Sequence, residues 1–264
     1  MSDTPRLSAL CVVHNEARRL DDCLRGLSFV DQIVVVLDRC TDESKAIVLK
    51  YGAKIVEGAW PIEGPRRQAG QKACDGRWIF EIDADERVPE PLAAEIAMII
   101  KARDTIGSGP DWWRIPFDNY IGDHLVRYGW GAQFGVGAKA ILYRKGIKSW
   151  ENQRVHPKVK MDGLCGGTLE NRMDHLVDEN ISDMLLRLDR YTTLRAQDLI
   201  EDGDIGTQRK NIARIFGRFY KCYLLRKGYR EGILGFIIAI CAGLYPILSY
   251  AKALEIKNSS KGST

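Results

Sequence analysis

The chain has 264 residues, of which 45% are apolar and 28% charged, a composition typical of a globular protein with one large domain or one domain plus an appendage. Its seven cysteines are odd in number and form no Cys-x-x-Cys pair, which argues against a disulfide framework or metal knuckle and favours reduced thiols in a cytosolic setting. The net charge of +4 is uneven: residues 203–264 hold 11 Lys and Arg against 3 Asp and Glu, so the tail calls for an anionic partner such as nucleic acid or a lipid surface.

The first hundred residues alternate apolar runs with amphipathic segments. Residues 32–37 form a continuous β-branched run, as a strand covered on both faces requires. Repeated strand–helix units predict an α/β fold with a mostly parallel sheet and right-handed crossovers. The expected strands are residues 7–13, 32–37, 54–57 and 78–82, and the expected helices are residues 17–26, 41 or 42 to 51, 65–74 and 90–103.

Polar residues follow each of these four strands. Ligands bind outside the carboxyl ends of strands in open α/β sheets, so these residues are expected to line one rim. Acidic groups for a metal and a ribose or base, with arginines for a diphosphate, indicate a nucleotide-sugar site. No Gly-x-Gly-x-x-Gly or P-loop sequence is present to indicate dinucleotide binding or a P-loop enzyme. The four groups are His14–Glu16, Asp38–Asp42, Gly64–Gln68 and Asp83–Glu86.

Asp83 and Asp85 stand where the fourth expected strand gives way to a loop. Residues two apart in a strand point to the same side, so the two carboxylates are expected to aim at one spot. Oxygen donors placed in this way suit a hard divalent cation that also takes substrate phosphates as ligands. A solvated acidic turn is the alternative for a bare Asp-x-Asp, and the polar groups upstream favour the metal.

The four polar blocks occur in the order and spacing of glycosyltransferase family 2, which the chain therefore resembles. Later segments resemble the bacterial branch that includes β-1,4-glucosyltransferases of the lipopolysaccharide inner core. The resemblance implies a Rossmann-like GT-A fold, a UDP-sugar donor, a divalent metal (Mn or Mg) and inversion at the anomeric carbon. The blocks are Val12–Glu16, Val35–Asp42, Arg66-Arg67 and Ile82–Glu86, and the later segments are Val155-His156, Asp174-His175 and Asp189–Ala196.

Four residues of the nucleotide-sugar site take roles from the resemblance. Asp38 would contact the uracil or ribose of the donor, with a helix-capping carboxylate as the alternative. Glu16 would shape the same pocket, or serve only as an acidic residue in the first turn of a helix. Arg66 or Arg67 would neutralise the donor diphosphate, because a guanidinium makes forked contacts with phosphate.

The resemblance also implies the metal ligands. Asp85 would bind the metal directly, and Asp83 would bind the ribose or assist the metal. The cation would stabilise charge on the leaving UDP. Inverting transfer further needs a general base to take a proton from the acceptor hydroxyl. Related enzymes often show His-Glu where this chain has His156-Pro157, so the base stays open among His156, Glu151, Asp118 and Asp123.

The tail predicts membrane association. Residues 208–230 indicate a basic amphipathic helix, which is typical of a membrane-surface element, although a solvated face on a packed helix is the alternative. Residues 232–251 contain no charged side chain and could just span a bilayer. Their glycines and Pro246 weaken a span, so interfacial docking, a true span and a buried soluble helix all stay open.

The sequence therefore predicts a GT-A glycosyltransferase domain over residues 1–202 and a helical tail over residues 203–264 that docks on an anionic membrane through residues 208–256. The expected activity is inverting transfer of a sugar from a UDP-linked donor to a hydroxyl of a lipid-linked glycan such as lipopolysaccharide core. Glucose is the sugar that we expect before others. The expected place is the cytoplasmic face of a bacterial inner membrane. One alternative is a polyprenyl-phosphate glycosyltransferase, and another is a non-catalytic basic binding protein. No recognised nucleic-acid motif is present, so no nucleic-acid partner is expected.

Overall fold

The structure is a computed structural model that describes residues 5–130, 135–151 and 158–261. The chain divides into two compact units. Unit 1 comprises Met1–Asp118 and Gly137–His175, and unit 2 comprises Asn119–Val136 and Leu176–Thr264.

The boundary expected between residues 202 and 203 does not coincide with this division. Helix α5 (Ile181–Glu201) belongs to unit 2 because it packs along helix α7 (Gly232–Lys261). The ammonium of Lys252 on α7 lies 2.7 Å from a carboxylate oxygen of Asp189 on α5. The last helix before the expected boundary is thus part of the same helical unit as the tail.

Unit 1 begins with the strands and helices that the sequence predicts. Strands β1 and β4 are buried along their whole length, which agrees with their apolar composition. The elements are β1 (Leu7–Val13), α1 (Ala17–Arg25), β2 (Gln32–Asp38), α2 (Ser44–Lys50), β3 (Lys54–Gly58), α3 (Glu63–Ala73), β4 (Trp78–Ile82) and α4 (Glu90–Ile106).

The described strands build a mixed sheet whose main path runs β3-β2-β1-β4-β8-β6-β12-β5. Strand β1 pairs in parallel with β2 and β4, and β2 pairs in parallel with β3, whereas β8 pairs antiparallel with both β4 and β6. The α/β class with parallel strands at its start is confirmed. The later strands are β5 (Glu86–Arg87), β6 (Trp112–Ile121), β7 (His124–Val126), β8 (Ala138–Arg144), β9 (Lys148–Trp150), β10 (Val159–Met161), β11 (Cys165–Thr168) and β12 (Met173–Asp178).

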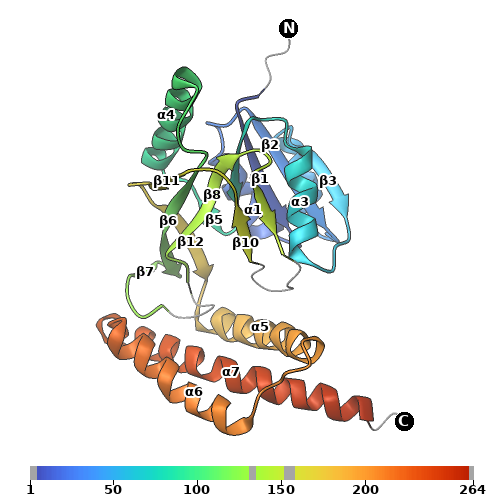
Figure 1. The fold of residues 1–264 in the computed structure, drawn as a ribbon, viewed down its shortest axis with the longest axis vertical. Helices are drawn as coiled ribbons and strands as arrows, with labels where there is room; N and C mark the ends of the chain where they lie inside the picture. Colours follow the sequence, from blue (N-terminus) through green and yellow to red (C-terminus); the bar gives the residue numbers. More distant parts are fainter. Residues whose placement is uncertain (1–4, 131–134, 152–157, 262–264) are drawn as a thin grey trace. The chain divides into compact units, whose positions relative to one another are not determined.

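Helix α3 packs closely against the parallel strands of unit 1 (Figure 1). The contact depends on Gly70, because a Cβ there would lie 2.4 Å from Leu10 Cδ1 and 2.6 Å from Val36 Cγ2. Leu10 and Val36 belong to a fully buried apolar cluster on this face. The close approach fixes α3, which carries Arg66 and Arg67 near its first turn.

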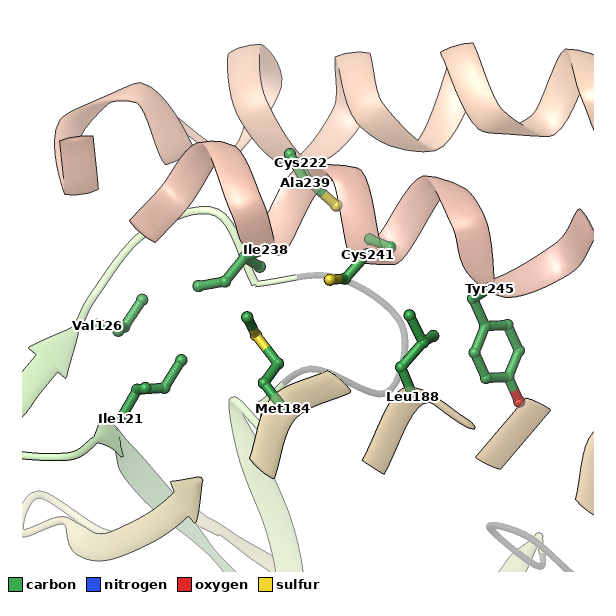
Figure 2. Close-up of a cluster of buried hydrophobic side chains, with 10 residues drawn as sticks. Ile121, Val126, Met184, Leu188, Cys222, Ile238, Ala239, Cys241 and Tyr245 are labelled. Atoms are coloured by element: carbon green, nitrogen blue, oxygen red, sulfur yellow. The ribbon is translucent and has the colours of Figure 1, made fainter. Parts of the chain in front are cut away.

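Unit 2 is built around α7, with α5 and α6 (Gln208–Tyr220) packed against it (Figure 1). Figure 2 shows Met184 and Leu188 of α5 facing Ile238, Cys241 and Tyr245 of α7 in a buried apolar cluster. Such a cluster is the core of a small helical unit, because burying aliphatic and aromatic side chains removes their surface from water.

The basic amphipathic helix expected over residues 208–230 is not one continuous α-helix. Helix α6 ends at Tyr220, and a π-helical turn (Lys221–Leu225) and a 3₁₀ turn (Gly228–Glu231) follow it. Lys227 and Gly232 flank the 3₁₀ turn with φ values of 59° and 58°. Left-handed backbone of this kind interrupts a helix.

The apolar run over residues 232–251 is helical and lies within α7, with Pro246 inside the helix. The segment Gly228–Ser259 is long and apolar enough to cross a membrane, and half of its most apolar part is buried inside the structure. One such helix is weak support for a span, because the core helix of a soluble protein passes the same test.

Candidate active site

The loops after β1, β2 and β4 bring the expected polar residues to one edge of the sheet in unit 1. These strands are parallel neighbours, so their carboxyl ends meet at the same edge. The amide of Thr41 donates to Asn15 Oδ1 over 2.7 Å and ties the first two loops together. Asn15 and Arg39 adopt positive φ values of 57° and 51°, an uncommon backbone conformation for residues other than glycine and one that is found at functional sites.

Asp38 lies at the end of β2 and is completely buried. Its Oδ1 accepts from Arg39 Nε and from the Trp60 amide, and its Oδ2 accepts from Arg39 Nη2 and Arg66 Nη1, each over 3.0 Å. Burial raises the pKa of the Asp38 carboxyl, but these hydrogen bonds outweigh it and hold that pKa below its usual value. The role of Asp38 toward a uracil or ribose stays a prediction, and in this arrangement the half-exposed Arg39 covers the carboxylate.

The two adjacent arginines of α3 have different surroundings. Arg67 is nearly neutralised, because its guanidinium contacts Glu63 at 2.8 Å and Asp83 at 3.1 Å and lies 3.8 Å from Glu81. Arg66 contacts only the shared Asp38 carboxylate, and its buried Nε has no hydrogen-bond partner among the described residues. A buried donor without a partner is costly. Arg66 is therefore the one of the two that has donor capacity left for a phosphate oxygen.

The acidic loop after β4 is a turn and not a continuation of the strand. The strand ends at Ile82, and the Glu86 amide donates to the Asp83 carbonyl over 3.0 Å. The expectation that strand alternation aligns Asp83 with Asp85 is therefore wrong. The turn nevertheless keeps Asp83 and Asp85 in one short loop, two residues apart in the chain.

Two cations hold Asp83. Arg67 Nη2 lies 3.1 Å from one of its carboxylate oxygens and Lys139 Nζ lies 3.3 Å from the other. Burial raises the pKa of Asp83, but the charges of Arg67 and Lys139 outweigh it and place that pKa well below its usual value. Asp83 is therefore a fixed anion at the edge of the acidic loop.

Asp85, Glu86 and His175 form a group that could hold a metal ion, because one ligand atom from each lies within 4.8 Å of the others. His175 Nε2 lies 3.6 Å from Asp85 Oδ2. Strand pairing brings His175 here, since β12 pairs antiparallel with β5 and places His175 opposite Glu86. Burial raises the pKa of Asp85, but the hydrogen bond and charge of His175 outweigh this effect and lower it.

Both carboxylate oxygens of Glu86 accept hydrogen bonds within the site, so Glu86 stabilises the group and offers less to a metal ion than Asp85 and His175 do. Its Oε2 accepts the Asp83 amide over 2.9 Å, and its Oε1 accepts from Lys139 Nζ over 2.7 Å. The donor set that faces a cation is thus one carboxylate and one imidazole, with Asp83 adjacent. Carboxylate oxygens suit Mg²⁺ and Mn²⁺, and Mg²⁺ in such sites takes further ligands from substrate phosphates and water. The residues present fit the expected divalent cation.

The four candidates for the base fall in different places. His156 lies outside the described residues. Glu151 is exposed, and its backbone lies beside the first turn of α3, where a Cβ on Gly64 would come within 2.7 Å of the Glu151 carbonyl oxygen. Asp123 is exposed in the turn between β6 and β7, within unit 2.

Asp118 accepts a hydrogen bond from Arg172 Nε over 2.6 Å. Burial raises the pKa of Asp174, and the negative charge of Asp118 raises it further. Successive residues of a strand point to opposite faces, so Asp174 faces away from the side on which His175 meets Asp85. The ring centre of Phe117 on β6 lies 5.8 Å from that of His175, so the next residue, Asp118, points to the opposite face of the sheet. Its role as a base stays a prediction without support from this geometry.

Some residues of the site carry no signal in the sequence. Lys139 binds the Asp83 carboxylate, yet nothing in the pattern around it indicates this contact. Arg39 stands within the polar group Asp38–Asp42, but the sequence gives it no role toward the Asp38 carboxylate that it binds. Lys139 pairs with residues more than 50 positions earlier in the chain. His175 belongs to the segment Asp174-His175, which resembles the related family branch. That resemblance is the one sequence signal for its position beside Asp85.

Comparison with known proteins agrees with this geometry. The family described as Glycosyl transferase family 2 matches residues 8–156. The lipopolysaccharide core biosynthesis glycosyltransferase LpsC of Rhizobium meliloti (strain 1021) is 29% identical over 260 residues, which cover 94% of this chain and 92% of LpsC. An uncharacterized glycosyltransferase of Rickettsia bellii (strain RML369-C) is 23% identical, with 96% of this chain and 87% of that protein covered.

Among solved structures, S. aureus TarS aligns with a TM-score of 0.50 and 15% identity, covering 96% of this chain and 54% of the TarS chain. The chain thus spans about half the length of TarS, and the likeness concerns the fold alone. Together with the family match, it confirms a GT-A-like mixed sheet with a helical C-terminal segment.

Proposed function

The chain belongs to glycosyltransferase family 2, and from this membership we propose that unit 1 is an inverting transferase that moves one sugar from a UDP-linked donor to a hydroxyl of a lipid-linked glycan. The pairing of Asp85 with His175 beside Asp83, at the carboxyl end of β4, carries the proposal. The similarity to LpsC supports lipopolysaccharide core as the acceptor class, with glucose as the first donor sugar to test. Membership in an enzyme family argues against the alternative of a non-catalytic binding protein.

Asp85 and His175 are the residues that would hold a divalent cation, with Asp83 as an adjacent acidic group. When bound, the cation supplies Lewis-acid stabilisation of the negative charge on the leaving UDP. The paired cations Arg67 and Lys139 keep Asp83 ionised. Glu86 holds the Asp83 amide over 2.9 Å and so fixes the turn from which Asp85 projects.

Arg66 would bind the donor diphosphate through its guanidinium, since the side chain is 23% exposed and pairs with no described carboxylate other than Asp38. A phosphate oxygen would add a charge-assisted hydrogen bond to it. Asp38 orients Arg66 through their 3.0 Å contact. When Arg39 moves aside, Asp38 would accept hydrogen bonds from the nucleoside, and Glu16, whose amide donates to Ser44 Oγ, would shape the same pocket.

Of the base candidates, Glu151 has the support of position. It lies beside the start of α3, the helix that carries Arg66. An exposed carboxylate on this rim could take the proton from an acceptor hydroxyl as the sugar transfers. His156 and Asp123 stay predictions.

Unit 2 would dock the enzyme on an anionic membrane surface. Exposed apolar side chains occur together with basic ones over residues 208–256: Phe216 is 72% exposed and Ile233 is 74% exposed, and Lys221, Arg226 and Lys227 are exposed as well. Half of the most apolar window of the candidate span is buried against the other helices, which supports interfacial docking over a span. Docking at the cytoplasmic face of an inner membrane would bring the enzyme to a lipid-linked acceptor.

Product analysis tests this function. The full-length protein is incubated with UDP-glucose and Mn²⁺ and with either a core oligosaccharide or undecaprenyl phosphate, and the products are identified by mass spectrometry. We expect transfer to the oligosaccharide and its loss in Asp85→Ala, with the circular dichroism of the variant unchanged. Transfer only to undecaprenyl phosphate would support a polyprenyl-phosphate glycosyltransferase instead. Undiminished transfer in excess chelator would contradict the metal role.

A further inference from the structure

A pocket lies in unit 1 at the amino end of β4, away from the acidic loop at its carboxyl end. Its volume is about 370 Å³, which falls within the range of small-molecule sites. Five residue steps of extended chain, about 16 Å, separate Trp78 in this pocket from Asp83 in the candidate active site. The pocket is lined by Asp75, Gly76, Arg77, Trp78, Arg103, Asp104, Gly107, Arg144 and Lys145.

The charges in this pocket do not cancel. Four of the lining side chains are cationic and two are acidic. The two acids have cations of their own, since Asp75 contacts Lys54 at 3.0 Å and Asp104 contacts Arg77 at 3.0 Å. Arg103 and Lys145 make no ion pair with any described residue, and the surplus of the pocket is therefore positive.

The surroundings of Arg103 are the main evidence for a ligand in this pocket. It is only 9% exposed, its Nε donates to the Pro110 carbonyl over 2.8 Å, and its guanidinium lies 5.9 Å from the centre of the Trp78 ring. Its Nη1 is buried and has no hydrogen-bond partner within the described ranges. Leaving a charged donor buried and unpaired is costly, and such an atom calls for an anion or an ordered water as its partner.

Lys145 approaches the same pocket from the end of β8. Its Nζ donates to the Cys74 carbonyl over 2.5 Å, which leaves two of its three N–H donors for another acceptor. Arg144 beside it keeps a longer contact of 3.4 Å with Asp111. A guanidinium and an ammonium from different elements thus line the same pocket, and an arginine suits the geometry of phosphate.

We propose that this pocket binds a small anion that carries a phosphate group, with the Arg103 guanidinium and Lys145 Nζ as its main donors. The pocket volume exceeds the share of a single water, about 30 Å³, more than tenfold, so it has room for a phosphorylated small molecule as well as for inorganic phosphate. The site is separate from the candidate active site, and the proposal does not depend on the proposed function.

Isothermal titration of the full-length protein with inorganic phosphate and, separately, with glucose 1-phosphate tests the site, at constant ionic strength set with sodium chloride. We expect saturable binding that weakens at least tenfold in Lys145→Met, because a charged donor is lost. Lys160→Met, which removes an exposed charge elsewhere in unit 1, serves as the matched control and should bind phosphate as the wild type does, whereas Arg66→Met tests whether phosphate binds at the active-site rim instead. Tighter binding of glucose 1-phosphate would identify a phosphorylated metabolite as the ligand, and equal affinity would identify free phosphate.

Arg103→Met should abolish binding, but loss of a buried arginine can also reduce stability, so Lys145→Met decides the outcome. Lys145 supports no buried ion pair, and its variant is expected to fold normally. Absence of phosphate binding in the wild type would overturn the proposal. Equal affinity of the wild type and Lys145→Met would overturn it as well, and loss of binding in Arg66→Met alone would assign the phosphate to the active-site rim.

Discussion

Replacing Lys148 by Met should strongly destabilise unit 1, because the carboxylate of Glu81 would then be buried without its closest cation. Both side chains are 4% exposed, and Lys148 Nζ lies 2.6 Å from Glu81 Oε2. Removing one partner of a buried ion pair typically costs about 3–5 kcal/mol. Glu81 would keep the hydrogen bond from the Tyr143 hydroxyl (2.5 Å) and the more distant Arg67 guanidinium (3.8 Å). The lower end, about 3 kcal/mol, is therefore expected.

Amide hydrogen exchange in β4, measured along a urea titration, reports the loss of stability within unit 1 itself. Lys160→Met is the matched control, because Lys160 is 75% exposed and its loss should change stability by less than about 0.5 kcal/mol. The double variant Glu81→Gln with Lys148→Met removes both charges and should recover at least half of the loss. A cost below about 1 kcal/mol for Lys148→Met, or no recovery in the double variant, would refute the reasoning.

Three further predictions concern the donor site, acid stability and the membrane. Arg66→Met should raise the KM for the UDP-sugar about tenfold or more, through loss of a charge-assisted hydrogen bond; an unchanged KM in steady-state assays would count against it. The pKa of Asp83 is lowered on folding, so its contribution to stability is present above its unfolded pKa of about 3.9 and is lost as the pH falls below it. Urea midpoints should thus fall more steeply below pH 4 for the wild type than for Asp83→Asn, and parallel curves would contradict this. Phe216→Ser combined with Ile233→Ser should reduce co-sedimentation with anionic vesicles about tenfold, while Met98→Ser in unit 1 leaves it unchanged; equal sedimentation of all three proteins would exclude docking through unit 2.

The strands at the start of the chain could be predicted because each is a continuous apolar run. The run from Ile33 to Leu37 is almost fully buried between two neighbouring strands. Local composition alone therefore places β1 to β4 and the rim at their carboxyl ends. It also places Asp38 and Asp83 on that rim, since Asp38 is the last residue of β2 and Asp83 comes directly after β4.

The remaining contacts depend on long-range pairing that local patterns do not record. Lys139 reaches Asp83 because β8 pairs antiparallel with β4, and His175 reaches Asp85 because β12 pairs with β5. The turn at Asp83 depends on the hydrogen bond from Glu86, which no strand pattern predicts. The division into two compact units likewise depends on long-range contacts, since α5 packs along α7.

Electron paramagnetic resonance of Mn²⁺, titrated into the protein with UDP present, tests the central claim most directly. The wild type should bind Mn²⁺ in a UDP-dependent manner, because Asp85 and His175 supply only part of a coordination sphere and the diphosphate supplies more. Asp85→Asn should weaken this binding at least tenfold, and Lys160→Met should leave it unchanged. Equal affinity of the wild type and Asp85→Asn for Mn²⁺ would contradict the account.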